Sequence, residues 1–241
     1  MIPFVVGTML AQSLAMAPAP ISAAPSPFGV GETIEYVGHY KFLSPGHVTL
    51  KVVGVDDVRG AKAWHFSLAM NVAVLMFHSS TALDSWTAID PFESLKYRKV
   101  IDGKTSEFAI FPDSGFYRSS GDTTHHPTPH DPIDDLAFIY FLRTTPLHEH
   151  AHYDFSHYYR MDKNPVSIDV LGREMVSLDD GTRRYCWILH PIVDEPNGMF
   201  ARDHDARLWL TDDGLRLPVQ IRSNYSVGAI TLRMRRVTLA H

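Results

Sequence analysis

Hydrophobic and polar residues alternate along several stretches of the chain. The stretches contain, in order, Val48, Leu50 and Val52, then Trp64, Phe66, Leu68 and Met70, and near the end Ile230, Leu232 and Met234. Successive side chains of an extended strand point to opposite faces. Each stretch therefore predicts a strand with one face in the core and the other in water, as in an antiparallel sheet.

Turn signals separate these stretches. Each combines Gly with Asp, Ser or Pro, which are residues that favour tight turns between strands. They are Ser44-Pro45-Gly46, Asp56 to Gly60, Asp102-Gly103, Asp179-Asp180-Gly181 and Asp212-Asp213-Gly214. Short strands joined by such turns predict a mainly β protein, built as an antiparallel curved sheet or an incomplete barrel.

One segment, Asp131 to Arg143, breaks the alternation and predicts a short helix. Asp131 suits the N-cap and Pro132 the first helical position, while Asp134 and Asp135 suit the positive end of the helix dipole. The residues that follow are apolar on all sides, which indicates burial. We expect one short buried helix against the sheet, either as an ordinary part of the core or as a plug or lid.

The first 31 residues contain no charged side chain and include an apolar run from Phe4 to Ala11. Ala15-Met16-Ala17 and Ser22-Ala23-Ala24 then show the small-x-small arrangement that signal peptidase recognises. We predict a signal peptide over residues 1–24, a linker over residues 25–30 and a single β domain over residues 31–241, located in the periplasm or secreted. No Lys or Arg precedes the run, so a wrongly assigned start codon or a disordered cytosolic leader are alternatives. The run is too short for a transmembrane segment.

The composition narrows the classes of partner. The chain has 241 residues, of which 45% are hydrophobic, and a formal net charge of -5. This length allows one sizeable core, and the negative charge argues against nucleic acid, because phosphates attract cationic surfaces. Cys186 is the single cysteine, which excludes an internal disulfide, and we interpret it as a small buried hydrophobic residue.

Common catalytic motifs are missing from the sequence. It contains no GxSxG nucleophile elbow, no HExxH helix, and no GxGxxG or P-loop nucleotide site. Asp203-His204-Asp205 could polarise an imidazole, but it follows Pro196-Asn197-Gly198 and is interpreted as a solvated loop. The sequence identifies no catalytic residue, and a non-catalytic role is favoured.

A long apolar stripe forms the first candidate site. Its strand contributes Trp64, Phe66, Leu68 and Met70, continued by Val72, Val74 and Met76, and the helix residues Phe138, Tyr140 and Phe141 are expected to lean over it. A curved sheet with such a face can hold an acyl chain, because ligand pockets are mostly apolar and often lie at a barrel mouth. We predict Trp64, Phe66, Leu68, Met70, Phe138 and Phe141 as ligand-binding residues. The alternative is that these side chains simply fill the core.

A set of histidines forms the second candidate site. His148, His150 and His152 occupy alternate positions, and in an extended segment they would point to one face, about 7 Å apart. Two such imidazoles can share a divalent metal such as zinc or copper, with a further ligand from His157 or from His125, His126 and His130. The alternative is a polar strand start in a chain that is rich in histidine.

Several short segments occur in a characteristic order between Gly31 and Met234. They are Gly31-Glu32 with Tyr36, Gly46, Asp84-Ser85-Trp86 with Asp90-Pro91, the acidic and aromatic run ending in Leu142-Arg143, Val170 to Glu174, Tyr185 to Pro191, and Leu208 to Asp213 with Leu217-Pro218-Val219 and Gly228. In this order they resemble the bacterial proteins catalogued as domain of unknown function 3108. The resemblance implies an exported envelope protein and carries over no catalytic residue. The last segments also resemble the half-barrel lipoprotein carriers of the periplasm, from which the chain departs between Asp122 and Pro146.

Three hypotheses on function follow. The first is a non-catalytic envelope protein that binds an apolar ligand, such as a lipid or a lipoprotein acyl chain. The second is a metal-binding protein or metal-dependent enzyme that uses His148, His150 and His152. The third is an envelope scaffold that binds an envelope-protein partner and no small ligand. The first hypothesis requires an internal cavity, and the second requires imidazoles that converge on one point. The third requires a filled core and an exposed apolar patch.

Overall fold

The computed structural model describes residues 26–41, 43–74, 77–195, 200–225 and 228–240. The predicted signal peptide therefore lies outside the described residues. The strands are β1 Thr33–Tyr40, β2 Leu43–Val58, β3 Ala61–Val74, β4 Phe77–Ala88, β5 Ser94–Ile101, β6 Lys104–Phe111, β7 Phe116–Ser119, β8 His126–Pro127, β9 His152–Phe155, β10 Val166–Ser177, β11 Arg183–Ile192, β12 Arg207–Thr211, β13 Pro218–Tyr225 and β14 Gly228–Thr238. The α-helix is α1 Asp135–Thr144, and the 3-10 helices are η1 Pro112–Ser114, η2 Met161–Lys163 and η3 Arg202–His204.

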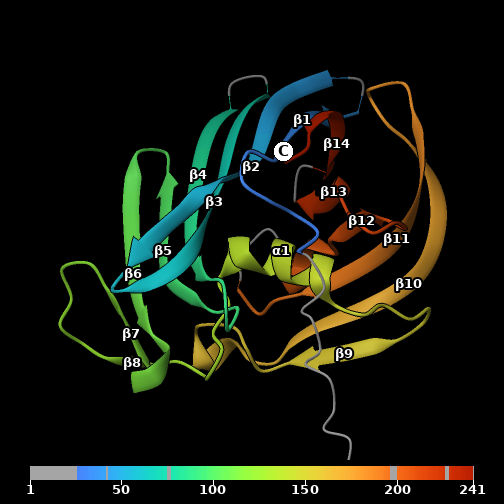
Figure 1. The fold of residues 1–241 in the computed structure, drawn as a ribbon. Helices are drawn as coiled ribbons and strands as arrows, with labels where there is room; N and C mark the ends of the chain where they lie inside the picture. The colour runs from blue at the N-terminus through green and yellow to red at the C-terminus, as the bar shows by residue number, and fades with distance from the viewer. Residues whose placement is uncertain (1–25, 42, 75–76, 196–199, 226–227, 241) are drawn as a thin grey trace, which may run out of the picture.

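The strands of the described chain form one antiparallel sheet. Its order is β8-β7-β6-β5-β4-β3-β2-β1-β14-β13-β12-β11-β10-β9, so pairing of β1 with β14 joins two meanders. The sheet curves around α1 and is not closed, since β8 and β9 are its two edges (Figure 1). The predicted fold class, a curved antiparallel sheet or incomplete barrel with one short buried helix, is confirmed.

The alternation in the sequence corresponds to the two faces of the strands. In β3, Phe66 and Leu68 are 0% and 2% exposed, whereas Ala69 and Asn71 are exposed. β3 pairs with β2 from Gly46↔Val72 to Val58↔Ala61. The buried residues of the two strands therefore face the same core.

The turn signals are confirmed where Asp and Gly occupy the turn itself. Asp102-Gly103 joins β5 to β6 with φ values of 49° and 80°, and Asp179-Asp180-Gly181 joins β10 to β11. Asp212-Asp213-Gly214 lies between β12 and β13. Asp102, Gly103 and Gly181 have positive φ, which Asp and Gly adopt at little cost in tight hairpins.

Two turn predictions are displaced. Ser44-Pro45-Gly46 lies inside β2, because Tyr40 pairs with Leu43 and the reversal occurs around Lys41, which has a φ of 54°. Asp56 and Asp57 also lie in β2, paired with Ala63 and Lys62. That turn is confined to Arg59-Gly60, where both residues have positive φ.

Helix α1 begins later than the sequence predicted. Asp134 is the N-cap, and its carboxylate accepts hydrogen bonds from the backbone N–H groups of Leu136 and Ala137, both at 2.9 Å. The prediction of Asp131 as N-cap is wrong, because the backbone there is held in a non-helical form. Asp131 has a φ of 53°, and the Pro132 carbonyl accepts the N–H of Ser94 at 2.6 Å.

The core lies between α1 and the concave face of the sheet. Leu136, Ala137, Ile139 and Leu142 of the helix are 0–1% exposed, and they belong to the same buried cluster as Phe66 and Leu68. Figure 1 shows the helix inside the curve of the sheet. The expectation of a buried helix is confirmed.

The gap in strand pairing between β8 and β9 is called the seam below. Residues 128–134 and 156–160 cross it and are joined by a parallel bridge between Ile133 and Tyr158. The N–H of Ile133 donates to the His157 carbonyl at 2.6 Å, and the N–H of Tyr159 donates to the Ile133 carbonyl at 3.1 Å. Single backbone contacts, rather than a strand pair, therefore connect the two edges of the sheet.

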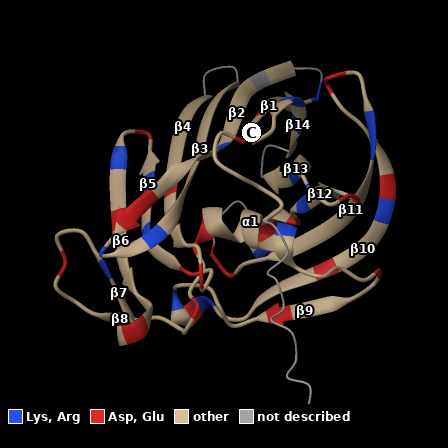
Figure 2. Ribbon diagram, in the orientation of Figure 1, with Lys and Arg blue, Asp and Glu red and all other residues tan. Residues whose placement is uncertain are grey.

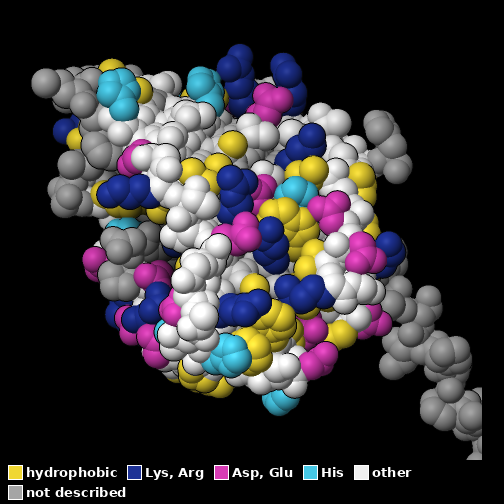
Figure 3. Space-filling model, turned by 90° about the vertical axis from the view of Figure 1, so that its left-hand side faces the viewer, with side chains coloured by type: hydrophobic (Ala, Val, Ile, Leu, Met, Phe, Trp, Pro, Cys, Tyr) yellow, Lys and Arg dark blue, Asp and Glu magenta, His cyan; other side chains and the backbone are white. Residues whose placement is uncertain are grey.

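The outer surface is mixed in character. Charged residues are spread along the strands and mark both ends of α1 (Figure 2). On the side formed by β5, β6 and β7, hydrophobic side chains form small separate patches between charged and histidine side chains (Figure 3). Within the described ranges, no helix is long and apolar enough to cross a membrane.

Candidate functional site

The apolar residues predicted on β3 lie in the core beneath α1. Phe66 and Leu68 are fully buried, and Trp64 and Met70 are partly buried against the same cluster. Val72 is half-buried, whereas the Val74 side chain and Met76 lie outside what the structure describes. The predicted stripe is thus a wall of the core.

The helix presents different aromatic residues to its two sides. The Tyr140 ring stacks on Phe66 with a centroid distance of 3.7 Å. Phe138 and Phe141 stack on each other at 6.4 Å, and Phe141 meets Phe155 of β9 at 5.2 Å. Residues three apart share a helix face, whereas residues two apart do not. The expectation that all three rings lean over the β3 stripe is corrected to Tyr140, because Phe138 and Phe141 face the seam.

Phe28 fills the space between β3 and α1. Its ring lies 5.0 Å from Tyr140, 5.5 Å from Phe66 and 5.6 Å from Trp64, measured between ring centroids, and Phe28 is 7% exposed. Phe28 belongs to the stretch 25–30 that the sequence predicts as a linker. A side chain of the protein itself therefore occupies the position expected for an apolar ligand over Trp64 and Phe66.

A small apolar cleft lies on the other side of α1, beside the seam. This seam cleft has a volume of about 10 Å³ and is lined by Ile133, Phe138, Phe141, Phe155, His157, Tyr158 and Val166. Phe141 and Phe155 are half-buried, and their rings are nearly perpendicular, at 89°. A volume this small is at the lower limit for one water molecule, so the aromatic walls are in contact.

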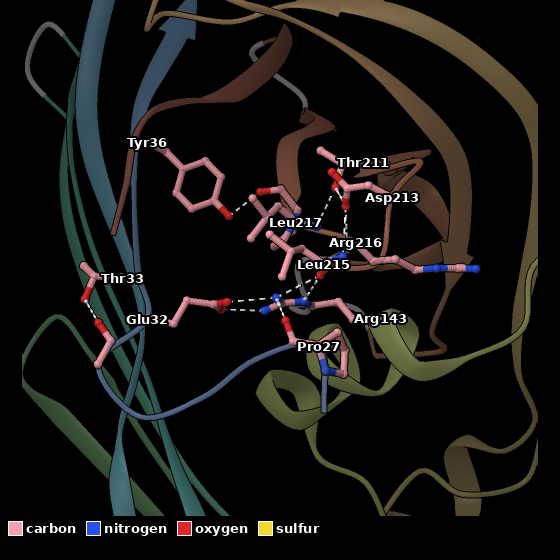
Figure 4. A network of polar contacts seen from close by, with 12 residues as sticks. Pro27, Glu32, Thr33, Tyr36, Arg143, Thr211, Asp213, Leu215, Arg216 and Leu217 are labelled. Carbon is pink, nitrogen blue, oxygen red and sulfur yellow. Dashed lines mark hydrogen bonds and ion pairs between the residues drawn. The ribbon is translucent and has the colours of Figure 1, made fainter. Parts of the chain in front are cut away.

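A buried ion pair fixes the C-terminal end of α1. Arg143, 2% exposed, donates from Nη1 to Glu32 Oε1 at 2.5 Å and from Nη2 to Glu32 Oε2 at 2.9 Å. It also donates to the carbonyls of Pro27 and Leu215 (Figure 4). The guanidinium lies 5.3 Å from the Phe28 ring centroid. Arg143 thus joins the segment that carries Phe28, the start of β1, helix α1 and the loop after β12.

The loop after β12 is shaped to present its carbonyl to Arg143. Asp213 accepts hydrogen bonds from the Thr211 hydroxyl at 2.7 Å and from the N–H groups of Leu215 and Arg216 at 3.0 Å (Figure 4). These bonds close the turn so that the Leu215 carbonyl points at the guanidinium. The acidic turn is therefore structural.

A second buried polar cluster fixes the N-terminal end of α1. Asp134 is 0% exposed, accepts the Ser85 hydroxyl at 2.6 Å, and donates its own N–H to the Ser94 hydroxyl oxygen at 2.9 Å. Burial raises the pKa of Asp134 to about 6, although the hydrogen bonds to Ala137, Ser85 and Ser94 act in the opposite direction. The neighbouring carboxylate, Asp135, accepts the hydroxyls of Tyr97 and Tyr158. These groups hold the helix against β4 and β5.

The three predicted metal-binding histidines do not converge. His152 is in β9, but His148 and His150 precede the strand, and His150 has a φ of 60°. The segment is therefore not extended across all three residues, as the prediction required. His152 instead contacts Asp169 from Nδ1 at 2.7 Å and Asp154 from Nε2 at 3.1 Å. Over the described residues, no group of three or more His, Cys, Asp or Glu side chains is placed to hold a metal ion.

Cys186 and a surface hollow are two further features of the molecule. Cys186 is buried, as predicted, and burial raises the pKa of its thiol to about 12, so it stays protonated. A shallow hollow of about 530 Å³ lies at the end of β2, β3 and β4. It is lined by Ser44, Gly46, His47, Asn71, Val72, Ala73, His78, Ser79, Ser80 and Asp102, most of them exposed.

Sequence reasoning missed Phe28 and the Glu32–Arg143 pair. Phe28 lies in a Pro-rich stretch without alternation, and its one signal is a lone aromatic residue between Pro27 and Gly29. Glu32 and Arg143 are 111 positions apart, and no local pattern connects them. Glu32 and Arg143 nevertheless each lie in a segment that carries the family resemblance.

Comparisons with known proteins support that resemblance. A family model described as "Protein of unknown function (DUF3108)" matches residues 35–235. No curated protein matches the chain. Among solved structures, the fold is similar to the "Beta-barrel-like Protein of Domain of Unknown Function DUF1849 from Brucella abortus", with a TM-score of 0.52, 7% identity, and coverage of 89% of this chain and 99% of that chain. At this identity the likeness shows the fold alone. Because the family match spans most of its length, the chain belongs to the DUF3108 family of proteins of unknown function.

Proposed function

We propose that this protein binds one acyl chain, of a lipid or a lipoprotein, in the seam cleft and catalyses no reaction. The observation that carries the proposal is the pair of half-buried rings, Phe141 on α1 and Phe155 on β9, at the wall of an apolar cleft. Ligand sites are mostly apolar and concave, and they often lie at the opening of a barrel. The seam is such an opening.

The seam side of α1 is better suited to a ligand than the β3 side. Over β3, Phe28 and Tyr140 already contact Phe66 at close range. At the seam, four-residue β9 is an edge strand, paired on one side with β10, so fewer hydrogen bonds resist a movement of this wall. Because the cleft now holds about 10 Å³, an acyl chain would enter by separating Phe141 from Phe155.

The proposal places the protein in the periplasm or outside the cell, where acyl chains of envelope lipids and lipoproteins need an apolar site. The uncharged leader supports this location. An envelope-protein partner would be the donor or acceptor of the acylated molecule. The alternative of a scaffold without a small ligand is less favoured. On the surface around β5, β6 and β7, charged side chains separate the apolar patches (Figure 3), whereas a protein-binding surface is typically one contiguous apolar patch.

The test is native mass spectrometry of the protein exported to the periplasm of an expression host. We expect an added mass of lipid size that disappears on denaturation. The variants Phe141→Ser and Phe155→Ser should lose this mass, because each replaces an apolar wall of the cleft by a hydroxyl. Phe116→Ser is the matched control, since Phe116 is also half-buried but stacks on Phe111 and His125, away from the cleft. A bare protein mass in the wild type, or a lipid mass retained by both seam variants, would contradict the proposal.

A further inference from the structure

One wall residue of the seam cleft carries a buried nitrogen that has no partner. His157 Nδ1 is inaccessible to solvent and forms no hydrogen bond within the described chain. Its ring lines the cleft and lies 6.5 Å from that of Phe155. Most buried polar side-chain atoms are hydrogen-bonded, because an unpaired one costs about 1–3 kcal/mol. This atom therefore requires an explanation.

The His157 carbonyl and the polar groups of the neighbouring Tyr158 are already engaged. The Tyr158 hydroxyl donates to Asp135 at 2.7 Å, and the Tyr158 N–H donates to the Asn164 side chain at 2.9 Å. The His157 carbonyl accepts the N–H of Ile133. These bonds fix the backbone on both sides of the imidazole and leave Nδ1 available to a ligand in the cleft.

The surroundings define the chemistry of that ligand. The cleft combines an apolar lining, from residues such as Phe138, Phe141 and Val166, with one available imidazole nitrogen. A neutral imidazole that carries its proton on Nδ1 donates one hydrogen bond. The complementary ligand is a hydrocarbon chain with one acceptor oxygen at its end.

We infer that the ligand of the seam cleft presents a carbonyl oxygen to His157 Nδ1. The inference rests on the proposed function, because it concerns the same cleft, and it adds the chemical group by which the chain is recognised. A carbonyl oxygen is shared by free fatty acids and by acyl esters, whereas a plain hydrocarbon lacks it. His157 thus distinguishes an acyl chain from a plain hydrocarbon of the same size.

The experiment measures displacement of a fluorescent apolar probe, N-phenyl-1-naphthylamine, from the full protein. The competitors are lauric acid, methyl laurate and dodecane. In the wild type, at least one of the two carbonyl compounds should displace the probe at about one tenth of the dodecane concentration, which corresponds to one hydrogen bond. Displacement by the acid alone identifies a free fatty acid, and displacement by the ester, alone or with the acid, identifies an acyl ester as a ligand.

Variants of His157 test the role of Nδ1. His157→Phe keeps a flat ring without a donor and should bind dodecane and the carbonyl compounds equally. His157→Gln keeps a side-chain N–H and should retain part of the preference, and urea unfolding of both variants checks that they fold. An unchanged preference in a folded His157→Phe protein would overturn the inference and leave the proposed function intact. A wild type that binds no probe, or Phe141→Ser and Phe155→Ser proteins that bind it normally, would overturn the proposed function itself.

Discussion

The two sides of helix α1 are built from the same kinds of residue and differ in how completely they are packed. On the β3 side, Tyr140 lies flat on Phe66, and Phe28 covers both. On the seam side, Phe141 touches Phe155 edge-on, and both remain half-buried. The β3 side is backed by long strands, whereas the seam side is backed by β9, which has four residues.

This difference shows that an apolar stripe in the sequence does not by itself identify a ligand site. The long apolar stripe on β3 is the part that the protein covers with its own Phe28. The less regular aromatic residues around β9 form the less completely packed side. What separates core from candidate site is the number of strands that support each wall, and this number depends on the topology of the sheet.

The largest effect should come from breaking the ion pair that holds the β3 side closed. Glu32→Gln leaves the buried Arg143 guanidinium without its carboxylate, and removal of one partner of a buried pair costs about 3–5 kcal/mol. Urea unfolding followed by tryptophan fluorescence measures the loss. The segment that carries Phe28 should also become accessible to protease, because Arg143 binds the Pro27 carbonyl and stacks on Phe28.

Replacement of both partners is the control for this prediction. Glu32→Leu combined with Arg143→Met removes both charges and keeps apolar volume, so the double variant should be clearly more stable than Glu32→Gln. If Glu32→Gln unfolds at the wild-type urea concentration, the ion pair does not hold the β3 side closed. The comparison between the two sides would then rest on aromatic packing alone.

Alanine substitutions on the two sides test that packing directly. Phe66→Ala should cost about 3–5 kcal/mol, because it removes a fully buried ring and leaves a cavity. Phe141→Ala should cost about 1–2 kcal/mol, since the ring is half-exposed and the wall around it can close. Equal losses in urea unfolding would mean that the seam side is packed as tightly as the β3 side.

The sequence predicts the fold well because the fold depends on local patterns. Alternation places Phe66 and Leu68 in the core, and the Asp-Gly turns separate the strands. The local pattern favours Asp131 as the N-cap, whereas the helix begins after Asp134. The hydrogen bond from the Ser94 N–H of β5 to the Pro132 carbonyl, which no local pattern shows, holds the preceding backbone out of the helix. The sequence is sufficient to predict which aromatic residues of α1 share a face, since helical spacing puts Phe138 and Phe141 on one face and Tyr140 on the other.

The candidate site was harder to predict because it depends on contacts between distant segments. Phe155 and His157 meet Phe138 and Phe141 only because β9 is the edge strand next to the helix. The three alternating histidines formed a more conspicuous pattern in the sequence. The positive φ of His150 interrupts this pattern. Both ring nitrogens of His152 are in contact with carboxylates, those of Asp169 and Asp154.

A pH-dependent effect sharpens the comparison at the N-terminal end of helix α1, which both sides share. Burial raises the pKa of Asp134 from 3.8 to about 6, so the folded state binds this proton more tightly than the unfolded state does. The resulting stabilisation is present below pH 4 and is lost as the pH rises through 6, and the full shift corresponds to roughly 3 kcal/mol. Asp134→Asn cannot titrate, while its side-chain oxygen can still accept the N–H groups of Leu136 and Ala137.

Urea unfolding of wild type and Asp134→Asn between pH 4 and pH 7 measures the difference. All other titrating groups are common to both proteins, so the change in their stability difference reports Asp134 alone. The variant should gain on the wild type as the pH rises through 6. A constant difference would mean that the hydrogen bonds from Ser85, Leu136 and Ala137 compensate fully for burial. In that case the N-terminal end of α1 would be held equally firmly at acid and neutral pH, and an opening of the seam would have to come from β9 rather than from the helix.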